Sequence, residues 1–410
     1  NKMIKHWGVI GGIAAAIAAG VYVLWGPITE KKKRKKMVPG LLNLGNTCFL
    51  NSLLQGLAAC PSFVIWLERF SQSTLTSRET PLSKTLLKLL KALSSDEPSE
   101  EDILDAGCVL DVLRLYRWHI SSFEEQDAHE LFHVLTSSLE EERDREPKVT
   151  HLFDMQSLEE KNMACRSGPL HPIPSTWKFQ HPFHGRLTSN MSCKRCEHLS
   201  PVRYDSFDSL SLSIPLPQWG RPLSLDQCLQ HFISSETIKE VECENCTKEV
   251  LHSQRTTFVK QLKLGKCLCI HLQRLTWSNE GSPIKRQEHV QFSEHLSMDR
   301  YKHSKEHHNN NKPFSNGNCS SLFHYSAGVR PQLSLSCDLS AEYLFQLTAV
   351  LVHHGDMHSG HFITYRRSPA SARSSSLFSS QWLWVSDDSV RKASLHEVLS
   401  SNAYMLFYER

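Results

Sequence analysis

Residues 40–55 read Gly40-Leu41-Leu42-Asn43-Leu44-Gly45-Asn46-Thr47-Cys48-Phe49-Leu50-Asn51-Ser52-Leu53-Leu54-Gln55, a loop that runs into a helix. The loop half contains two Gly and two Asn, residues that permit tight turns and positive φ. Apolar residues then follow the spacing of one buried helix face: Phe49, Leu50, Leu53, Leu54, Leu57 and Ala58. Cys48 is therefore predicted at a helix N-terminus, where the dipole and the unpaired N–H groups stabilise a thiolate, the nucleophilic form of Cys.

Cys48 has two interpretations. A small buried Cys packed under a helix is the ordinary one. The flanking residues favour a nucleophile instead, because Asn43 on the preceding loop is placed to donate a side-chain N–H to an oxyanion beside Cys48. The pattern Asn-x-Gly-Asn-Thr-Cys-Phe-x-Asn-Ser-x-x-Gln resembles the Cys box of the ubiquitin-specific proteases, the papain-like deubiquitinating enzymes.

The composition sets outer limits on the fold and its partners. The chain has 410 residues, 40% of them hydrophobic, which suffices for one large core or two modest ones. Lys plus Arg number 46 and Asp plus Glu 43, so the bulk charge gives no indication of nucleic-acid binding. Thirteen mostly scattered Cys, with no recognisable cleavable signal, are typical of reduced thiols in a cytosol-facing protein.

An uncharged apolar run extends from Gly8 to Trp25, and cations fill residues 31–36 soon after it. Eighteen residues span roughly 27 Å as a helix, which is about the thickness of a bilayer core. A signal peptide would have a shorter apolar core with its charge on the other side. Residues 1–36 are therefore predicted to be a single-pass membrane anchor, and the C-terminal basic flank leaves the catalytic domain in the cytosol. The run resembles signal-anchors of mitochondrial outer-membrane proteins.

Residues 60–142 have helical patterns, including an amphipathic face of Leu82, Leu86, Leu87, Leu89, Leu90 and Leu93. The acidic stretch Glu125-Gln126-Asp127-Ala128-His129-Glu130 is either an ordinary helix N-terminus or a substrate contact. It is similar to a family box whose acidic residues contact the basic tail of ubiquitin. The resemblance gives that role to Asp127 and Glu130, while Glu125 replaces the family's first Gln. A polar loop is predicted from Glu140 to about Pro174.

Two Cys-x-x-Cys motifs, Cys193–Cys196 and Cys243–Cys246, lie in loops between extended segments. Four thiolates of this spacing are typical of a tetrahedral Zn²⁺ site, whereas two disulfides would need an oxidising compartment. Sulfur in all four positions leaves no open site for a substrate, so the predicted zinc is structural. The resemblance agrees, because the family's fingers subdomain carries such a zinc ribbon.

The third group of motifs lies near the C-terminus. Strands are predicted around Cys267, Cys269 and His271, with core packing favoured over a ligand role. His361 follows a Gly-rich turn and resembles the family's Gly-His-Tyr box, with Phe362 in place of Tyr. We interpret it as the general base that takes the Cys48 proton. His353 and His354 are weaker candidates for the same role.

The partner that orients the base His is less clear from the sequence. Trp382-Leu383-Trp384-Val385-Ser386-Asp387-Asp388 resembles the family's Trp-x-x-Phe-Asn/Asp-Asp box, in which the Asn or Asp performs this role. Ser386 occupies that position, and its hydroxyl can accept an imidazole N–H without carrying a charge. Asp387 is the competing candidate, although adjacent residues of a strand point to opposite faces. Ser386 is the preferred prediction.

Together these motifs predict an α+β fold of the papain-like ubiquitin-specific protease type behind the anchor. The predicted catalytic domain, residues 37–410, divides into a thumb (37–175), zinc-ribbon fingers (176–260) and a palm (261–410) with insertion loops near 300–335 and 368–380. The resemblance implies a monomeric thiol-dependent ubiquitinyl hydrolase that cleaves isopeptide bonds at the ubiquitin C-terminus. With the anchor, it also implies mitochondrial outer-membrane substrates and opposition to ubiquitin-dependent mitophagy. The alternative is a catalytically impaired, membrane-anchored scaffold that binds ubiquitin.

Overall fold

The helix that begins at Cys48 is buried on all sides. α2 (Cys48–Ala58) buries every residue, including the polar Asn51, Ser52 and Gln55, whereas one buried face was predicted. The reason is tertiary, since α2 contacts strands β12 and β13 as well as helices α4 and α6. The computed structural model describes residues 38–73, 81–95, 102–115, 127–144, 180–193, 196, 198, 200, 201, 203–217, 220–234, 236–239, 255–277, 281–301, 343–356, 360–370 and 378–410.

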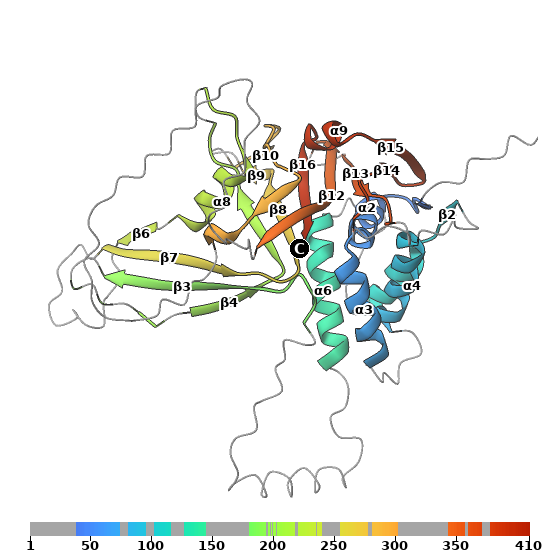
Figure 1. Ribbon diagram of the computed structural model, residues 1–410, viewed down its shortest axis with the longest axis horizontal. Helices are drawn as coiled ribbons and strands as arrows, with labels where there is room; N and C mark the ends of the chain where they lie inside the picture. Colours follow the sequence, from blue (N-terminus) through green and yellow to red (C-terminus); the bar gives the residue numbers. More distant parts are fainter. Residues whose placement is uncertain are drawn as a thin grey trace, which may run out of the picture. The chain divides into compact units, whose positions relative to one another are not determined.

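Four further helices pack beside α2 or against its neighbours: α3 (Pro61–Ser73), α4 (Leu82–Ser94), α5 (Gly107–Leu115) and α6 (Ala128–Asp144) (Figure 1). The leucine face predicted for α4 is buried except for Leu87, which is only partly buried. The loop predicted from Glu140 is wrong over the last turn of α6, which continues to Asp144. Glu142 is buried there and accepts a hydrogen bond from the Ser83 backbone N–H at 3.1 Å, so a tertiary contact extends a helix whose composition is polar.

An eight-stranded sheet carries the C-terminal motifs. Its strands follow the order β15-β14-β13-β12-β16-β8-β5, with β11 (His295–Ser297) also paired to β12. All pairs are antiparallel except β5 with β8. Cys267, Cys269 and His271 are buried in the core, as predicted. The bounds are β5 (Ser209–Ser213), β8 (Cys267–Gln273), β12 (Leu344–Gly355), β13 (Gly360–Arg367), β14 (Trp382–Ser386), β15 (Ser389–Ala393) and β16 (Ala403–Glu409).

A second, antiparallel sheet follows the order β4-β3-β7-β6. Its strands are β3 (Gly185–Cys193), β4 (Arg203–Phe207), β6 (Glu236–Lys239) and β7 (Arg255–Lys263). The helix α8 (Leu225–Ile233) contacts β5 of the larger sheet and β7 of the smaller one, and it begins with a reciprocal capping box of Ser224 and Gln227. The remaining elements are short: β1 (Gly40–Leu41) paired to β2 (Ile103–Leu104), β9 (Leu275–Trp277) paired to β10 (Pro283–Lys285), the 3₁₀ helix η3 (Asp299–Tyr301) and α9 (Leu395–Leu399).

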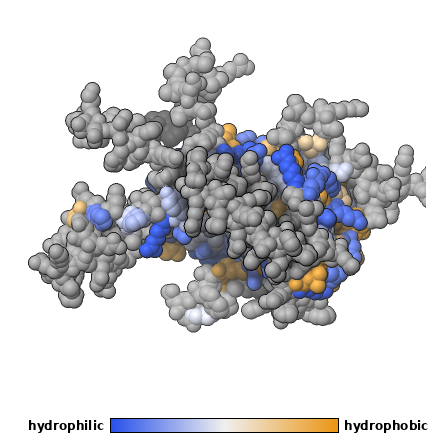
Figure 2. All heavy atoms as spheres, turned by 90° about the horizontal axis from the view of Figure 1, so that it is seen from below, coloured by the Kyte–Doolittle hydropathy of each residue, from blue (hydrophilic) through white to orange (hydrophobic). Residues whose placement is uncertain are grey.

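The residues from Val38 to Arg410 form one compact unit. On the face shown in Figure 2, hydrophilic and hydrophobic described residues are intermixed. The predicted anchor lies outside the described residues, and so does most of both predicted insertion loops. Among the residues that are described, no single helix is long and apolar enough to cross a bilayer; α2 and α3 meet that criterion only as a pair bent by 93°.

Candidate active site

Cys48 is the first residue of α2, and its side chain is almost buried, with 9% of the residue exposed. Thr47 occupies the N-cap position without capping the helix through its side chain. Its hydroxyl instead accepts the Leu44 backbone N–H at 2.9 Å and so closes the loop before the helix. The Thr47 hydroxyl therefore accepts no hydrogen bond from the first-turn N–H groups of α2, which lie beside the Cys48 thiol. The N-terminal end of a helix stabilises a negative charge, so this position favours the thiolate form of Cys48.

The start of β13 faces the N-terminus of α2. Thr364 donates to the Ser52 backbone carbonyl at 2.8 Å, and Arg366 donates to the Gln55 side-chain oxygen at 2.8 Å. The helix and the strand therefore run in the same direction along one another. One turn before Ser52 on the helix is Cys48, and the corresponding end of the strand begins with Gly360 and His361. The packing brings the predicted nucleophile and the predicted base to the same end of this contact.

His361 is hydrogen-bonded to Ser386, the last residue of β14: its Nε2 lies 2.7 Å from the Ser386 Oγ. Since Nε2 is engaged by the hydroxyl, Nδ1 is the ring nitrogen left to exchange a proton with a thiol. His354 stands directly opposite His361 in the β12–β13 register, so it is a neighbour of the imidazole on the same face. Burial lowers the pKa of His354, as does the charge of Lys285.

Asp387 holds a different part of the site. It lies in the turn after β14 with φ of 47°, and its carboxylate accepts from Asn43 and Asn51, each over 2.8 Å. Its backbone carbonyl accepts the Leu41 N–H at 2.8 Å. The strand alternation used to disfavour Asp387 does not apply, because Asp387 is outside the strand. Ser386 is nevertheless the residue that contacts His361, and Asp387 anchors the loop in front of Cys48.

Asn43 is held at both ends of its amide. Its oxygen accepts the Gly45 N–H at 3.1 Å and the Thr47 N–H at 3.3 Å, and one amide hydrogen goes to Asp387. An amide nitrogen carries two hydrogens, so one remains for an oxyanion near Cys48. The predicted role of Asn43 therefore depends on that second hydrogen.

Asp127 lies just before α6, and its carboxylate caps the helix by accepting the His129 N–H at 2.6 Å. It also accepts a short hydrogen bond from Tyr404, whose pKa is raised by burial and by this carboxylate. The Tyr404 ring packs 5.4 Å from the ring of Phe362, the neighbour of His361. Asp127 is thus linked through Tyr404 to β13, the strand that carries His361. Glu130, in contrast, is exposed on the first turn of α6.

His353 supports the strand that carries His361. Burial, followed by the charge of Lys285, lowers the pKa of His353 to about 4, so the ring is neutral at pH 7. The ring lies against Gly360, where an added Cβ would come within 1.9 Å of the His353 Nε2. Gly360 therefore allows the close approach of the two strands, and His353 packs against the strand that carries His361.

Comparison with known proteins identifies the family. The model of "Ubiquitin carboxyl-terminal hydrolase" matches residues 39–408. The chain belongs to this family. It is 69% identical to Ubiquitin carboxyl-terminal hydrolase 30 of Danio rerio, covering 100% of the chain and 93% of the relative. It is 60% identical to the Homo sapiens protein of the same name, covering 100% and 91%. The chain is accordingly a ubiquitin-specific protease, a cysteine protease.

Solved structures show the same fold at lower identity. The SAGA DUB module of Ubp8, Sgf11, Sus1 and Sgf73 bound to monoubiquitin matches with a TM-score of 0.60 and 21% identity, covering 96% of this chain and 74% of that chain. The same module bound to ubiquitin aldehyde gives a TM-score of 0.59. The predicted α+β, papain-like fold of the ubiquitin-specific proteases is thereby confirmed.

Two of the four predicted zinc ligands, Cys193 and Cys196, are among the described residues. Cys193 ends β3, and Cys196 lies in the following turn, closed by a hydrogen bond from the Cys193 N–H to the His198 carbonyl. Cys243 and Cys246 lie outside the described residues. They belong to the segment between Lys239 of β6 and Arg255 of β7, and these two residues pair with each other beside Cys193. Cys193 and the two residues that flank the undescribed segment therefore lie at the same end of the sheet, and four thiolates are a donor set typical of one structural Zn²⁺.

The sequence analysis missed the roles of Asn51, Gly360 and Tyr404. Asn51 stands in the Cys box, but only the fold shows that its amide bridges the Leu42 carbonyl and Asp387. Gly360 precedes the base His, which was a usable signal for close packing. Nothing in the local pattern of Tyr404 indicates its bond to Asp127, because the two residues are distant in sequence.

Proposed function

We propose that this protease removes ubiquitin from proteins of the mitochondrial outer membrane, with Cys48, His361 and Ser386 as its catalytic group. The observation that carries the catalytic part is the 2.7 Å contact between His361 and Ser386 at the end of β13 that faces the helix of Cys48. Cysteine proteases need this combination of a helix-terminal thiol, a base and a group that orients the base.

In the proposed mechanism, Ser386 Oγ accepts the Nε2–H of His361, which leaves the Nδ1 lone pair to take the Cys48 proton. The thiolate attacks the carbonyl carbon at the ubiquitin C-terminus, and the second amide hydrogen of Asn43 stabilises the oxyanion. The protonated His361 then gives its proton to the leaving lysine amine as the C–N bond breaks. Water, deprotonated by His361, hydrolyses the thioester and restores the thiol.

Substrate binding is proposed to use the acidic start of α6. Asp127 and Glu130 supply negative charge for the basic tail of ubiquitin, and Asp127 is held by Tyr404. The zinc proposed at Cys193, Cys196, Cys243 and Cys246 would brace the end of the smaller sheet where β3 finishes and would take no part in the chemistry.

A ubiquitin probe with a C-terminal electrophile tests the catalytic proposal. The probe should label the wild-type chain and leave Cys48→Ala unlabelled, while both proteins bind ubiquitin to a similar extent. A wild-type chain that binds ubiquitin without being labelled would instead indicate a ubiquitin-binding scaffold.

The proposed location rests on the apolar run Gly8–Trp25 and its basic flank. From this position the enzyme would oppose ubiquitin-dependent mitophagy. Deletion of residues 1–36 should release an active enzyme to the cytosol, while the full chain should resist carbonate extraction from mitochondria. Protease added outside intact mitochondria should digest the catalytic domain, and protection of that domain would contradict the proposed orientation.

A further inference from the structure

Three potential metal ligands from separate elements meet where α6 lies against the base of the smaller sheet. Glu140 belongs to α6, His181 precedes β3, and Asp208 joins β4 to β5. One donor atom from each lies within 4.8 Å of the other two. His181 Nε2 is 3.1 Å from Asp208 Oδ1 and 3.9 Å from Glu140 Oε1. Donors bound to one zinc ion at about 2.0–2.2 Å lie roughly 3.0–3.6 Å apart, so these separations are close to those of a ligand set.

His181 gives the strongest indication of a ligand. Its side chain is fully buried, and among the described residues neither ring nitrogen makes a hydrogen bond of acceptable geometry. Nε2 lies 3.1 Å from the Asp208 carboxylate, yet the carboxylate is poorly aligned with the direction in which a ring N–H would donate. A buried polar atom in this state is unfavourable, and a metal ion on the Nε2 lone pair would satisfy it. The edge of Trp66 packs 5.9 Å from the ring and limits its orientation.

The carboxylate of Asp208 is oriented by a hydrogen bond from α6. Thr136 of α6 donates to its Oδ2 at 2.7 Å and thereby directs Oδ1 toward His181. Metal ligands must be deprotonated, and their orientation is commonly fixed by such a second hydrogen bond.

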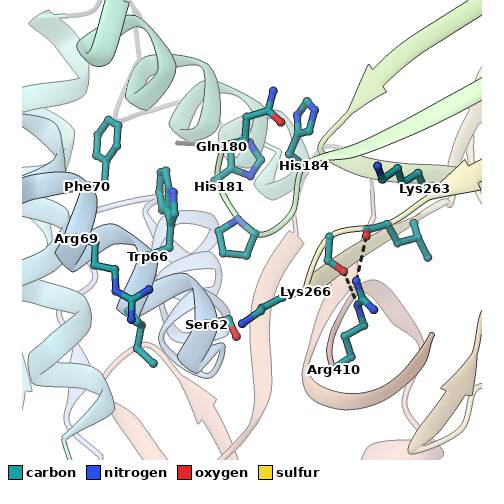
Figure 3. Close-up of a pocket in the computed structure, with 14 residues that line it drawn as sticks. Ser62, Trp66, Arg69, Phe70, Gln180, His181, His184, Lys263, Lys266 and Arg410 are labelled. Atoms are coloured by element: carbon teal, nitrogen blue, oxygen red, sulfur yellow. Dashed lines mark hydrogen bonds between the residues drawn. The ribbon is translucent and has the colours of Figure 1, made fainter. Parts of the chain in front are cut away.

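The surroundings of His181 and of Glu140 differ in charge and in exposure to solvent. Figure 3 shows the ring in the wall of a cavity of about 690 Å³, whose lining includes the cationic Lys263, Lys266 and Arg410. These charges repel a cation. Glu140 does not line that cavity, and its side chain is 42% exposed, so an ion can arrive from solvent and keep water ligands there.

We propose that Glu140, His181 and Asp208 bind a divalent transition ion of the Zn²⁺ or Mn²⁺ type, with water completing its coordination. One imidazole and two carboxylates are donors suited to these ions. The bound ion joins α6, which starts next to Asp127, to the base of the sheet that contains β3. This site is separate from the Cys-x-x-Cys motifs and from Cys48, and it does not depend on the proposed activity.

Manganese binding to the full chain, purified with its thiolate-bound zinc, tests the proposal. Thiolates favour softer ions, so Mn²⁺ should not replace zinc at the Cys motifs. Electron paramagnetic resonance of free Mn²⁺ should reveal one saturable site per chain, and added Zn²⁺ should compete for it. Asp208→Asn, which keeps the shape of the side chain, should weaken binding at least tenfold, and Glu140→Gln should weaken it severalfold.

Two control variants locate the site. Glu141→Gln changes the neighbouring carboxylate, and His133→Asn changes an imidazole two turns before Glu140 on the same face of α6; both should bind Mn²⁺ like the wild type. If Asp208→Asn does not fold, the surface variant Glu140→Gln still decides the matter. Absence of Mn²⁺ and of Zn²⁺ uptake beyond the thiolate site would overturn the proposal, and so would uptake that Asp208→Asn and Glu140→Gln leave unchanged.

Discussion

Replacing Ser386 by Ala removes the hydroxyl that contacts His361, the proposed base. The Oγ atom lies 2.7 Å from His361 Nε2, while the backbone of residue 386 pairs with Ser389 across the β14–β15 turn. The substitution keeps that backbone pairing. It also leaves the adjacent Asp387 free to keep its bonds to Asn43 and Asn51. The variant therefore isolates the effect of orienting the imidazole.

The expected loss follows from the kind of hydrogen bond. When His361 is protonated, the Ser386 contact becomes a hydrogen bond to a charged group, worth about 1.5–3 kcal/mol. At 1.36 kcal/mol per factor of ten, kcat should fall roughly 10- to 150-fold. This is less than the factor of about 10⁴ associated with a buried carboxylate, because a hydroxyl carries no charge. KM should change little, since Ser386 acts on the base and not on ubiquitin.

The measurement is steady-state hydrolysis of a fluorogenic amide at the ubiquitin C-terminus, with kcat and KM determined separately. Ser386→Asn is the matched control, because its side-chain carbonyl can also accept the Nε2–H, and it should retain substantial activity. A Ser386→Ala enzyme within twofold of the wild type, or a change confined to KM, would refute the reasoning. Asp387→Asn provides the comparison: an amide can accept from only one of Asn43 and Asn51 with its oxygen, so it should lower kcat by loosening the loop before Cys48.

Three further results are expected. Gly360→Ala should abolish most activity and lower the melting temperature, because its Cβ would lie 1.9 Å from the His353 ring; normal activity would mean that β12 and β13 can separate without cost. Cys193→Ser should reduce the zinc content from about one per chain and lower the melting temperature, whereas elemental analysis without zinc in the wild type would contradict the ribbon. His129 and His271 have pKa values of about 3, lowered chiefly by burial, so they stay neutral in the fold while the unfolded chain takes up protons below about pH 6.5. Stability should therefore fall as the pH drops from 6.5 toward 3, by about 2 kcal/mol at pH 5 for one such His, and denaturant unfolding of His129→Gln should depend less on pH.

The helix of Cys48 and the strands of His361 and Ser386 could be predicted from the sequence because each depends on local periodicity or on a short motif. The leucine spacing of α4 is a further case of this kind. The end of α6 was mispredicted, since the polar composition after Glu140 carries no trace of the contact between Glu142 and Ser83.

The choice between Ser386 and Asp387 shows where sequence reasoning stops. Strand alternation favoured Ser386, but Asp387 is in a turn with positive φ, where alternation has no meaning. Its two bonds to Asn43 and Asn51 depend on how distant segments pack, and a pattern along the chain does not encode such pairings directly. The roles of Cys243, Cys246 and the anchor stay predictions, because these residues lie outside the described part of the chain.

The bond between Asn43 and Asp387 joins residues 344 positions apart. At translation rates of about 5–20 residues per second, a ribosome needs roughly 17–70 s to pass from one to the other. Until residue 361 is added, the nascent chain holds Cys48 but neither His361 nor the carboxylate that fastens the loop beside Cys48. The thiol is thus synthesised well before the residues that activate and position it. Truncated translation products that lack these residues should carry no hydrolytic activity.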